Sequence, residues 1–145
     1  MELTWYFINT DGGSRGNPGE AAAGAVIRTS AGKVRELCGK YLGVATNNEA
    51  EYAAVILAYE TLLRLKDFSP KTTALKFSLD SNLVVNQLNG LFKVKEARLR
   101  SYILKIRSLE AEFAQVLYNY IPREQNQEAD KIVNQHLDAR IKRTS

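Results

Sequence analysis

The first nineteen residues constrain the fold of this chain more than any other stretch. The run Leu3–Ile8 is rich in β-branched and aromatic residues and is typical of a β-strand. Asp11 follows it, and the next segment, Gly12–Gly19, contains four glycines and a proline. Because glycine and proline favour turns, this pattern predicts a strand that ends at a carboxylate and leads into a tight turn with a bare backbone.

The size and composition are those of one globular domain. A chain of 145 residues with 45% hydrophobic and 25% charged residues can bury a substantial core. Its apolar stretch Ala21–Ile27 is too short to cross a bilayer, and no basic-then-apolar signal follows Met1. Cys38 is the only cysteine, which excludes an internal disulfide and a cysteine metal cage. We therefore expect a protein of the reducing cytoplasm.

Hydrophobic patterning predicts strands and helices along the rest of the chain. Two further strands follow the opening segment, and short turns between these three strands predict an antiparallel meander. A helix capped by Asn47 or Asn48 and running to Lys66 comes next. The two strands that follow the opening segment are expected at 22–29 and 33–41, and two later strands at 74–79 and 115–121. The other expected helices are a short one capped by Ser81, then 96–114 and 128–140.

This order of elements predicts the α/β fold class. Helical crossovers carry later strands back into the sheet, so we expect a mixed sheet flanked by helices. Residues 1–140 are expected to form one domain, and residues 141–145 a basic tail that frays.

Acidic residues stand at the ends of several predicted elements. Asp11 ends the first strand and Asp80 the fourth, and if these strands are parallel neighbours, both side chains emerge at one edge of the sheet. Glu51 and Asp130 lie near the starts of two helices, where an acidic residue commonly just offsets the helix dipole. Four converging carboxylates suit hard cations, and two such ions about 4 Å apart act in phosphodiester hydrolysis. Repulsion within the cluster is expected to raise at least one pKa.

Four segments of the chain resemble the type 1 ribonuclease H family, in the family's order and over nearly the whole sequence. They are 10–19 (TDGGSRGNPG), 46–51 (TNNEAE), 80–85 (DSNLVV) and 123–130 (REQNQEAD). The resemblance implies a ribonuclease H-like five-stranded mixed sheet, with three antiparallel strands and then two parallel ones. It also implies an endonuclease that hydrolyses the RNA strand of RNA–DNA hybrids and leaves 3′-hydroxyl and 5′-phosphate ends.

The same resemblance implies the metal-binding residues. Asp11 takes the position of the ligand that bridges two Mg²⁺ ions, for which Mn²⁺ can substitute. Glu51, rather than Glu49, takes the position of the family's glutamate, and Asp80 and Asp130 take the other two acidic positions. One ion would activate water and the other would stabilise the leaving 3′-oxygen, so that no Ser, Cys or His nucleophile is required.

Other residues are expected to contact the nucleic acid. Gly12 and Gly13 would let the backbone approach the ribose 2′-hydroxyl groups that distinguish RNA from DNA. Matching motif positions imply contacts in the minor groove or at a DNA phosphate for Asn17, Thr46, Asn47 and Asn48. The role of Asn47 or Asn48 as a helix cap is compatible with such contacts. The basic residues expected at the nucleic acid are Lys93, Lys95, Arg98 and Arg123.

Two features depart from the family pattern. Some members carry a histidine in the loop before the last acidic residue, whereas this loop offers Arg123 and Glu124. The only histidine, His136, lies six residues beyond Asp130 on the last helix, and we expect it to be structural. Some members also have a basic insertion that grips the hybrid, for which this chain is too short. The basic run 93–107 is expected to contact phosphates, although such runs are usually only solvated helix faces.

Two other functions remain open at this point. A nuclease of the same fold could act mainly on double-stranded RNA or DNA junctions, and a catalytically silent module could bind hybrids without cutting them. The intact set of four acidic residues argues against the silent module. The expected partner is an RNA–DNA hybrid, with no membrane association, no obligatory protein partner and a monomeric state.

Overall fold

The computed structural model describes the backbone of residues 2–144 and the side chains of residues 2–140. Strands and helices alternate after an opening meander of three strands. The strands are β1 (Thr4–Gly16), β2 (Gly19–Thr29), β3 (Val34–Ala45), β4 (Thr73–Leu79) and β5 (Gln115–Tyr120). The helices are α1 (Asn47–Leu63), α2 (Asn82–Leu88), α3 (Ala97–Glu110) and α4 (Gln127–Thr144), with short 3-10 turns at Pro70–Thr72 and Arg123–Gln125.

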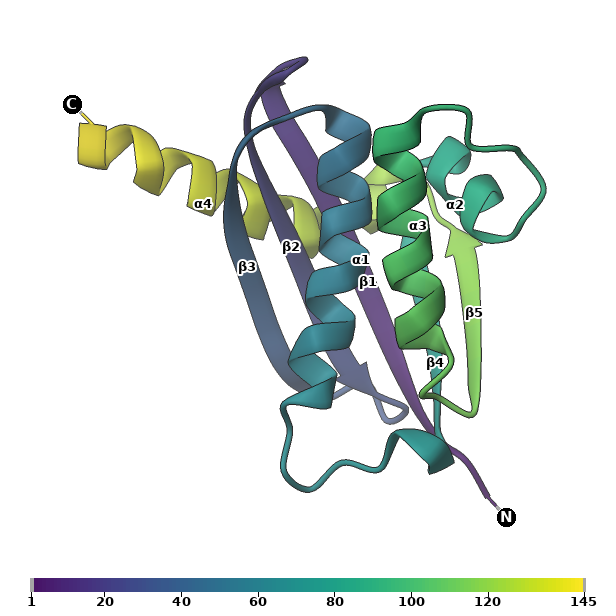
Figure 1. Cartoon of the computed structure of the whole chain (residues 1–145). Helices are drawn as coiled ribbons and strands as arrows, with labels where there is room; N and C mark the ends of the chain where they lie inside the picture. The colour runs from purple at the N-terminus through teal and green to yellow at the C-terminus, as the bar shows by residue number, and fades with distance from the viewer. Residues whose placement is uncertain (1, 145) are drawn as a thin grey trace.

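The five strands form one mixed sheet in the order β3-β2-β1-β4-β5. β1 pairs antiparallel with β2, and β2 with β3, whereas β1 and β4, and β4 and β5, are parallel. α1 and α3 lie side by side on one face of the sheet, and α4 packs against the first three strands from the other face (Figure 1). This architecture confirms the predicted α/β class and the predicted arrangement of three antiparallel and two parallel strands.

The main core lies between the sheet and the helices α1 and α3. Tyr52 and Tyr59 from α1 and Phe77 from β4 are among its largest fully buried side chains. One side of α3 faces this core, with Leu99 and Ile106 buried. None of the helices within residues 2–144 combines the length and the apolar composition that a membrane span requires.

β1 continues much further than the sequence predicts. Instead of ending at Asp11, it runs through the glycines to Gly16, and the turn is confined to Asn17 and Pro18. The reason is pairing within a hairpin, because β2 follows directly after the turn and pairs with this whole segment, as in the register Gly12↔Ala23. Asp11 therefore lies inside a strand, where hydrogen bonds to a neighbouring strand hold its backbone.

Two glycines let helices approach the sheet more closely than any side chain would allow. A Cβ atom on Gly12 would lie 2.1 Å from the backbone carbon and oxygen of Ala50, so that α1 rests directly on β1. On the opposite face, a Cβ atom on Gly24 would lie 2.8 Å from the backbone oxygen of Ala129 in α4. Gly24 is also the β2 partner of Asp11. Both helices are thus seated beside the acidic residue of β1.

The predicted N-cap of α1, Asn47 or Asn48, was wrong. Thr46 is the N-cap, and its hydroxyl accepts from the backbone N–H of Glu49 at 3.1 Å while the Glu49 carboxylate accepts from the N–H of Thr46 at 3.0 Å. This reciprocal capping box satisfies two exposed donors, which a cap at Asn47 or Asn48 would not do. The two asparagines are consequently the first residues of the helix, and α1 ends at Leu63 rather than at Lys66.

α4 extends beyond its predicted end at Arg140. Its backbone is helical to Thr144, so the segment 141–144, expected as part of a fraying tail, continues the helix in this structure. The side chains of the predicted basic tail 141–145 lie outside the described residues.

Candidate active site

Three carboxylates meet at the edge of the sheet where β1 and β4 approach α1. One oxygen from each of Asp11, Glu51 and Asp80 lies within 4.8 Å of the others. Asp11 and Glu51 are buried, each with 7% of its surface exposed, and Asp80 is half-buried. Oxygen atoms at this spacing can share one small divalent cation.

The parallel pairing of β1 and β4 explains how Asp11 and Asp80 meet. The last residues paired across these strands are Asn9 and Ser78, so Asp11 and Asp80 follow two residues later at the same level. A helical crossover between the strands favours this parallel arrangement, as predicted from the sequence. Asp80 lies just after β4 and immediately before Ser81, whose side chain caps α2.

Glu51 reaches the cluster because of the close contact between α1 and β1. Its Oε1 atom accepts a hydrogen bond from the backbone N–H of Gly12 at 3.1 Å. Glu49, the nearby acidic alternative, is occupied by the capping box and lies 3.4 Å from a guanidinium nitrogen of Arg98. The geometry therefore favours Glu51 over Glu49 as a ligand.

Burial and mutual repulsion make the cluster costly when all its carboxyl groups are charged. Burial, together with the charges of Asp80 and Asp130, raises the pKa of Asp11 from its ordinary value to about 7. The pKa of Glu51 also lies well above its ordinary value, chiefly because of burial and then because of the Asp11 charge. These shifts confirm the expectation that at least one carboxyl group of the site has a raised pKa.

One buried oxygen of the cluster, Glu51 Oε2, lacks a hydrogen-bond partner within residues 2–140. An unpartnered buried oxygen is destabilising, and a cation at this position would satisfy it. A donor set made only of carboxylate oxygens suits Mg²⁺ or Mn²⁺ better than metals that prefer sulfur or nitrogen. The residues present thus fit the divalent metal that the sequence implies.

Asp130 is not among the three carboxylates whose oxygens all lie within 4.8 Å of one another, although it interacts with Asp11. It lies in the first turn of α4, and one of its oxygens accepts a weak hydrogen bond from Asn134 Nδ2 at 3.3 Å. It nevertheless lines the same cleft and contributes to the raised pKa of Asp11. The structure therefore brings three of the four predicted acidic residues into ligand distance of one another and places the fourth on the wall.

The acidic cluster opens into a cleft of about 440 Å³. The predicted residues Gly12, Gly13, Asn47, Asn48 and Arg123 line this cleft together with the four acidic residues. Its other lining residues, which were not predicted as site residues, are Ser14, Arg15, Ser81, Val133, Asn134 and Leu137.

The two predicted glycines differ in their surroundings. Gly12 is buried against the backbone of α1, so its missing side chain serves packing. Gly13 faces the cleft, and a Cβ atom there would meet only Val133 Cγ1 at 3.8 Å. Of the two glycines, it is therefore Gly13 whose surface is open enough for a sugar to approach the backbone.

Polar groups at one end of the cleft hold one another in place. The backbone N–H of Asn47 donates to Asn17 Oδ1 at 3.0 Å, and Asn47 Oδ1 accepts from the N–H of Ser14 at 2.9 Å. The β1–β2 turn and the start of α1 are thereby joined. Ser14 lies within the first family-like motif, but no local pattern distinguishes it from an ordinary turn residue.

The basic residues before and within α3 lie outside the residues that line the cleft. Lys93 and Lys95 are in the exposed connection that leads to α3, and next to them Leu91 and Phe92 are 70% and 50% exposed. The Arg98 side chain is 72% exposed and pairs with Glu49 at the start of α1. The contact of these basic side chains with phosphate groups stays a prediction.

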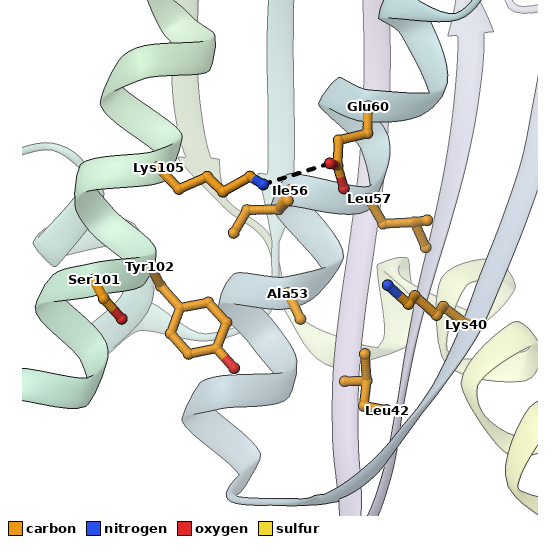
Figure 2. Close-up of a pocket in the computed structure, with 9 residues that line it drawn as sticks. All are labelled: Lys40, Leu42, Ala53, Ile56, Leu57, Glu60, Ser101, Tyr102 and Lys105. Atoms are coloured by element: carbon orange, nitrogen blue, oxygen red, sulfur yellow. Dashed lines mark ion pairs between the residues drawn. The ribbon is translucent and has the colours of Figure 1, made fainter.

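A larger hollow, of about 520 Å³, lies over the outer side of α1 between α3 and β3 (Figure 2). Its floor includes Ala53 and Ile56, and its one acidic residue, Glu60, is 3.6 Å from the ammonium of Lys105. Figure 2 shows these side chains turned toward each other across the hollow. A neutralised carboxylate over an apolar floor offers no metal site, so the smaller acidic cleft is the better candidate.

His136 has the structural position predicted for it. Its ring lies where a Cβ atom on Gly39 would be, 2.3 Å from the ring carbon Cε1, and its Nδ1 atom is 3.0 Å from the carbonyl oxygen of Ile132. The ring therefore packs α4 onto β3.

We expect His136→Ala to lower stability by about 1–2 kcal/mol, through loss of packing, while turnover stays within about tenfold of wild type. Thermal melts and steady-state kinetics on the same preparations would check this. A larger fall in turnover in a folded variant would contradict the structural role.

The sequence of this chain is similar to that of a known protein family and of several known proteins. A family model described as reverse transcriptase-like matches residues 9–136. The Ribonuclease HI of Halobacterium salinarum is 38% identical over 88% of this chain, and the Bifunctional protein Rv2228c of Mycobacterium tuberculosis is 37% identical over 91%. The chain spans 62% of the first relative's length and 35% of the second's.

The fold is shared with a solved structure of similar sequence. The crystal structure of LC11-RNase H1, a protein isolated from compost, in complex with an RNA/DNA hybrid superposes with a TM-score of 0.89 at 38% identity. The match covers 94% of this chain and 99% of that one.

Proposed function

Since this chain belongs to the type 1 ribonuclease H family, we propose that it is an endonuclease that hydrolyses the RNA strand of RNA–DNA hybrids. The products would carry 3′-hydroxyl and 5′-phosphate ends. The single observation that carries this proposal is the buried cluster of Asp11, Glu51 and Asp80, in which Glu51 Oε2 has no partner within residues 2–140. Such a cluster is costly to maintain unless a cation binds there.

The proposed cofactor is a pair of Mg²⁺ ions, for which Mn²⁺ can substitute. When bound, the ions would supply an activated water and stabilise the charge of the leaving 3′-oxygen. Asp11, Glu51 and Asp80 would hold the first ligand positions, and Asp130 would complete the site from the wall of the cleft. Gly12 contributes its N–H, which holds one Glu51 oxygen, and the other Glu51 oxygen would be available to a cation.

The proposed substrate is supported by the hybrid complex of LC11-RNase H1. In this chain, the open surface at Gly13 would admit the sugar of an RNA strand, whose 2′-hydroxyl distinguishes RNA from DNA. Asn17, Asn47 and Asn48 would contact the bases and the DNA strand at the end of the cleft. The predicted cytoplasmic location and monomeric state stay predictions.

A cleavage assay with three labelled duplexes tests the proposal. Incubation with an RNA–DNA hybrid, an RNA duplex and a DNA duplex, each with and without Mg²⁺, should give metal-dependent cuts in the RNA strand of the hybrid. EDTA should abolish them. Comparable cutting of the DNA duplex would overturn the assignment, and preferential cutting of the RNA duplex would identify the other nuclease considered above. Metal-dependent hybrid binding without any cut would identify a silent module.

The basic connection before α3 is expected to act through charge. Replacing Lys93 and Lys95 with alanine should weaken hybrid binding and reduce the slope of log affinity against log salt by about 1–2, because fewer counterions are released. Lys33 provides a matched control, since this exposed lysine lies in the β2–β3 turn, at the end of the sheet away from Asp11. A salt slope equal to that of the Lys33→Ala control would show that the connection does not touch phosphates.

A further inference from the structure

Asn126 is a buried side chain in an otherwise exposed loop. It lies between the 3-10 turn Arg123–Gln125 and the start of α4, and only 1% of its surface is exposed. It directly precedes Gln127, the first residue of α4, and so occupies the N-cap position of that helix. Its backbone carbonyl does accept from the N–H of Asp130 at 3.2 Å, as the first bond of the helix. The side chain, however, is turned to the sheet.

The amide of Asn126 uses its hydrogen-bonding capacity at the acidic site. Nδ2 donates to the carbonyl oxygen of Thr10 at 2.9 Å and to Asp80 Oδ2 at 3.0 Å. Oδ1 accepts from Asn9 Nδ2 at 3.1 Å. The side chain of Asn126 therefore joins β1 to Asp80, which follows β4. The backbone carbonyl of Asn126 joins this asparagine to α4, the helix of Asp130.

The orientation of this amide follows from its partners. The Thr10 carbonyl and the Asp80 carboxylate only accept hydrogen bonds, so the nitrogen of the amide must face them. The Asn9 donor then meets the amide oxygen. A reversed amide would place oxygen against two acceptors within the same distances, which is strongly unfavourable.

We propose that Asn126 is a positioning residue that orients the Asp80 carboxylate toward the divalent metal held with Asp11. By holding one Asp80 oxygen, the amide fixes the rotation of the carboxylate and ties it to the backbone of Thr10, the neighbour of Asp11. The amide also places a donor beside an anion that faces two other carboxylates. The inference rests on the proposed metal-dependent function, and partners of this kind typically change metal affinity or activity by 10- to 100-fold.

The test compares metal binding in two variants of the full chain. Asn126→Ala removes the amide, and Asn126→Asp keeps its size but replaces the donor with an oxygen close to Asp80. Mn²⁺ affinity is measured by calorimetry, and the rise in melting temperature on adding Mg²⁺ is recorded at about pH 8, where an ordinary carboxyl group is charged. Both variants should bind Mn²⁺ about 10- to 100-fold more weakly than wild type, with a smaller Mg²⁺-induced rise. Their kcat for hybrid cleavage should fall while KM stays within about threefold.

Tyr118→Phe is the control for general destabilisation. The Tyr118 hydroxyl is buried and bonds Tyr59 and Glu110, and none of these residues lines the acidic cleft. This variant should lower the melting temperature but keep the Mn²⁺ affinity of wild type. Should the Asn126 variants not fold, Asn9→Ala serves instead, because it frees the amide oxygen while keeping the contact with Asp80, and it should weaken Mn²⁺ binding several-fold.

The outcomes separate the inference from the function on which it rests. Wild type that binds no Mn²⁺ would overturn the proposed function itself. Wild type that binds Mn²⁺, with Asn126 variants that bind it as tightly as Tyr118→Phe does, would show that Asn126 only stabilises the fold. Wild-type affinity in Asn126→Asp alone would overturn the inference as well, because size rather than the donor would then be sufficient. If only Asn9→Ala folds, an affinity equal to that of wild type would also overturn it.

Discussion

Asp11→Asn is expected to abolish hydrolysis and, without metal, to melt at a temperature at least as high as wild type. The substitution keeps the shape of the side chain but removes the most central charge of the acidic cluster. It also removes the neighbouring charge that helps to raise the pKa of Glu51. A protein that gains stability on losing its activity is expected where function has been placed ahead of stability.

The stability of the metal-free wild type should depend on pH because the pKa of Asp11 differs between the folded and the unfolded state. The pKa of Asp11 is about 7 in the folded protein, against an ordinary value of 3.8, so between these pH values the folded state binds more protons than the unfolded state. The contribution of Asp11 to the stability of the metal-free wild type should therefore fall as the pH rises from about 4 to about 7, and the raised pKa of Glu51 lowers stability in the same direction. The loss from Asp11 is on the order of 2–4 kcal/mol, and Asp11→Asn should show a smaller fall.

Thermal melts across this pH range, with and without Mg²⁺, provide the measurement. At neutral pH without metal, the variant should melt about 5–10 °C above wild type. Added Mg²⁺ should stabilise wild type more than the variant, because only the complete cluster binds the ions well. A metal-free variant less stable than wild type, or one that cleaves the hybrid normally, would mean that Asp11 serves the strand rather than the chemistry.

Gly12→Ala is expected to destabilise the fold more than any other substitution that adds one methyl group near the site. The new Cβ atom would lie 2.1 Å from backbone atoms of Ala50 and 2.5 Å from the backbone nitrogen of Glu51. Because no side chain can move aside, α1 must shift away from β1 and take Glu51 with it. We expect a destabilisation of about 3 kcal/mol or more and loss of metal-dependent cleavage.

Gly13→Ala is the matched control, since it adds the same methyl group at the next residue. Its Cβ atom would meet only Val133 Cγ1 at 3.8 Å, an ordinary contact, so the fold and the Mg²⁺-induced stabilisation should be close to wild type. Hybrid affinity should fall instead, if a ribose approaches at this position. Circular dichroism, thermal melts and hybrid binding on both variants would separate these effects. Similar stability of the two alanine variants would refute the packing role of Gly12.

Local patterns were enough to predict most of the architecture. Alternating apolar residues, turn residues and the apolar stripe of α3 identified the elements in their order, because these signals depend on neighbours within a few residues. The helical crossover between β1 and β4 then indicated parallel strands, which brought Asp11 and Asp80 to one sheet edge. The choice of Glu51 came from the resemblance to a family motif, and the capping role of Glu49 agrees with it.

Two features near the site differ from the prediction, for different reasons. The glycines after Asp11 are typical of a turn, yet pairing with β2 makes them part of a strand. The cap of α1 could have been predicted locally, because Thr46 and Glu49 have the T-x-x-E spacing of a capping box, which the prediction of an asparagine cap overlooked.

Residue patterns and the family motifs identified the four acidic residues, the order of the elements and the crossover that brings Asp11 near Asp80. The close contact of Gly12 with α1 and the hydrogen bond from the Asn126 side chain to Asp80 could be recognised only in the folded chain. Asn126 lies 46 residues from Asp80 and more than a hundred from Asn9 and Thr10. Contacts over such separations exist only after the sheet has formed, and no periodicity within one element records them.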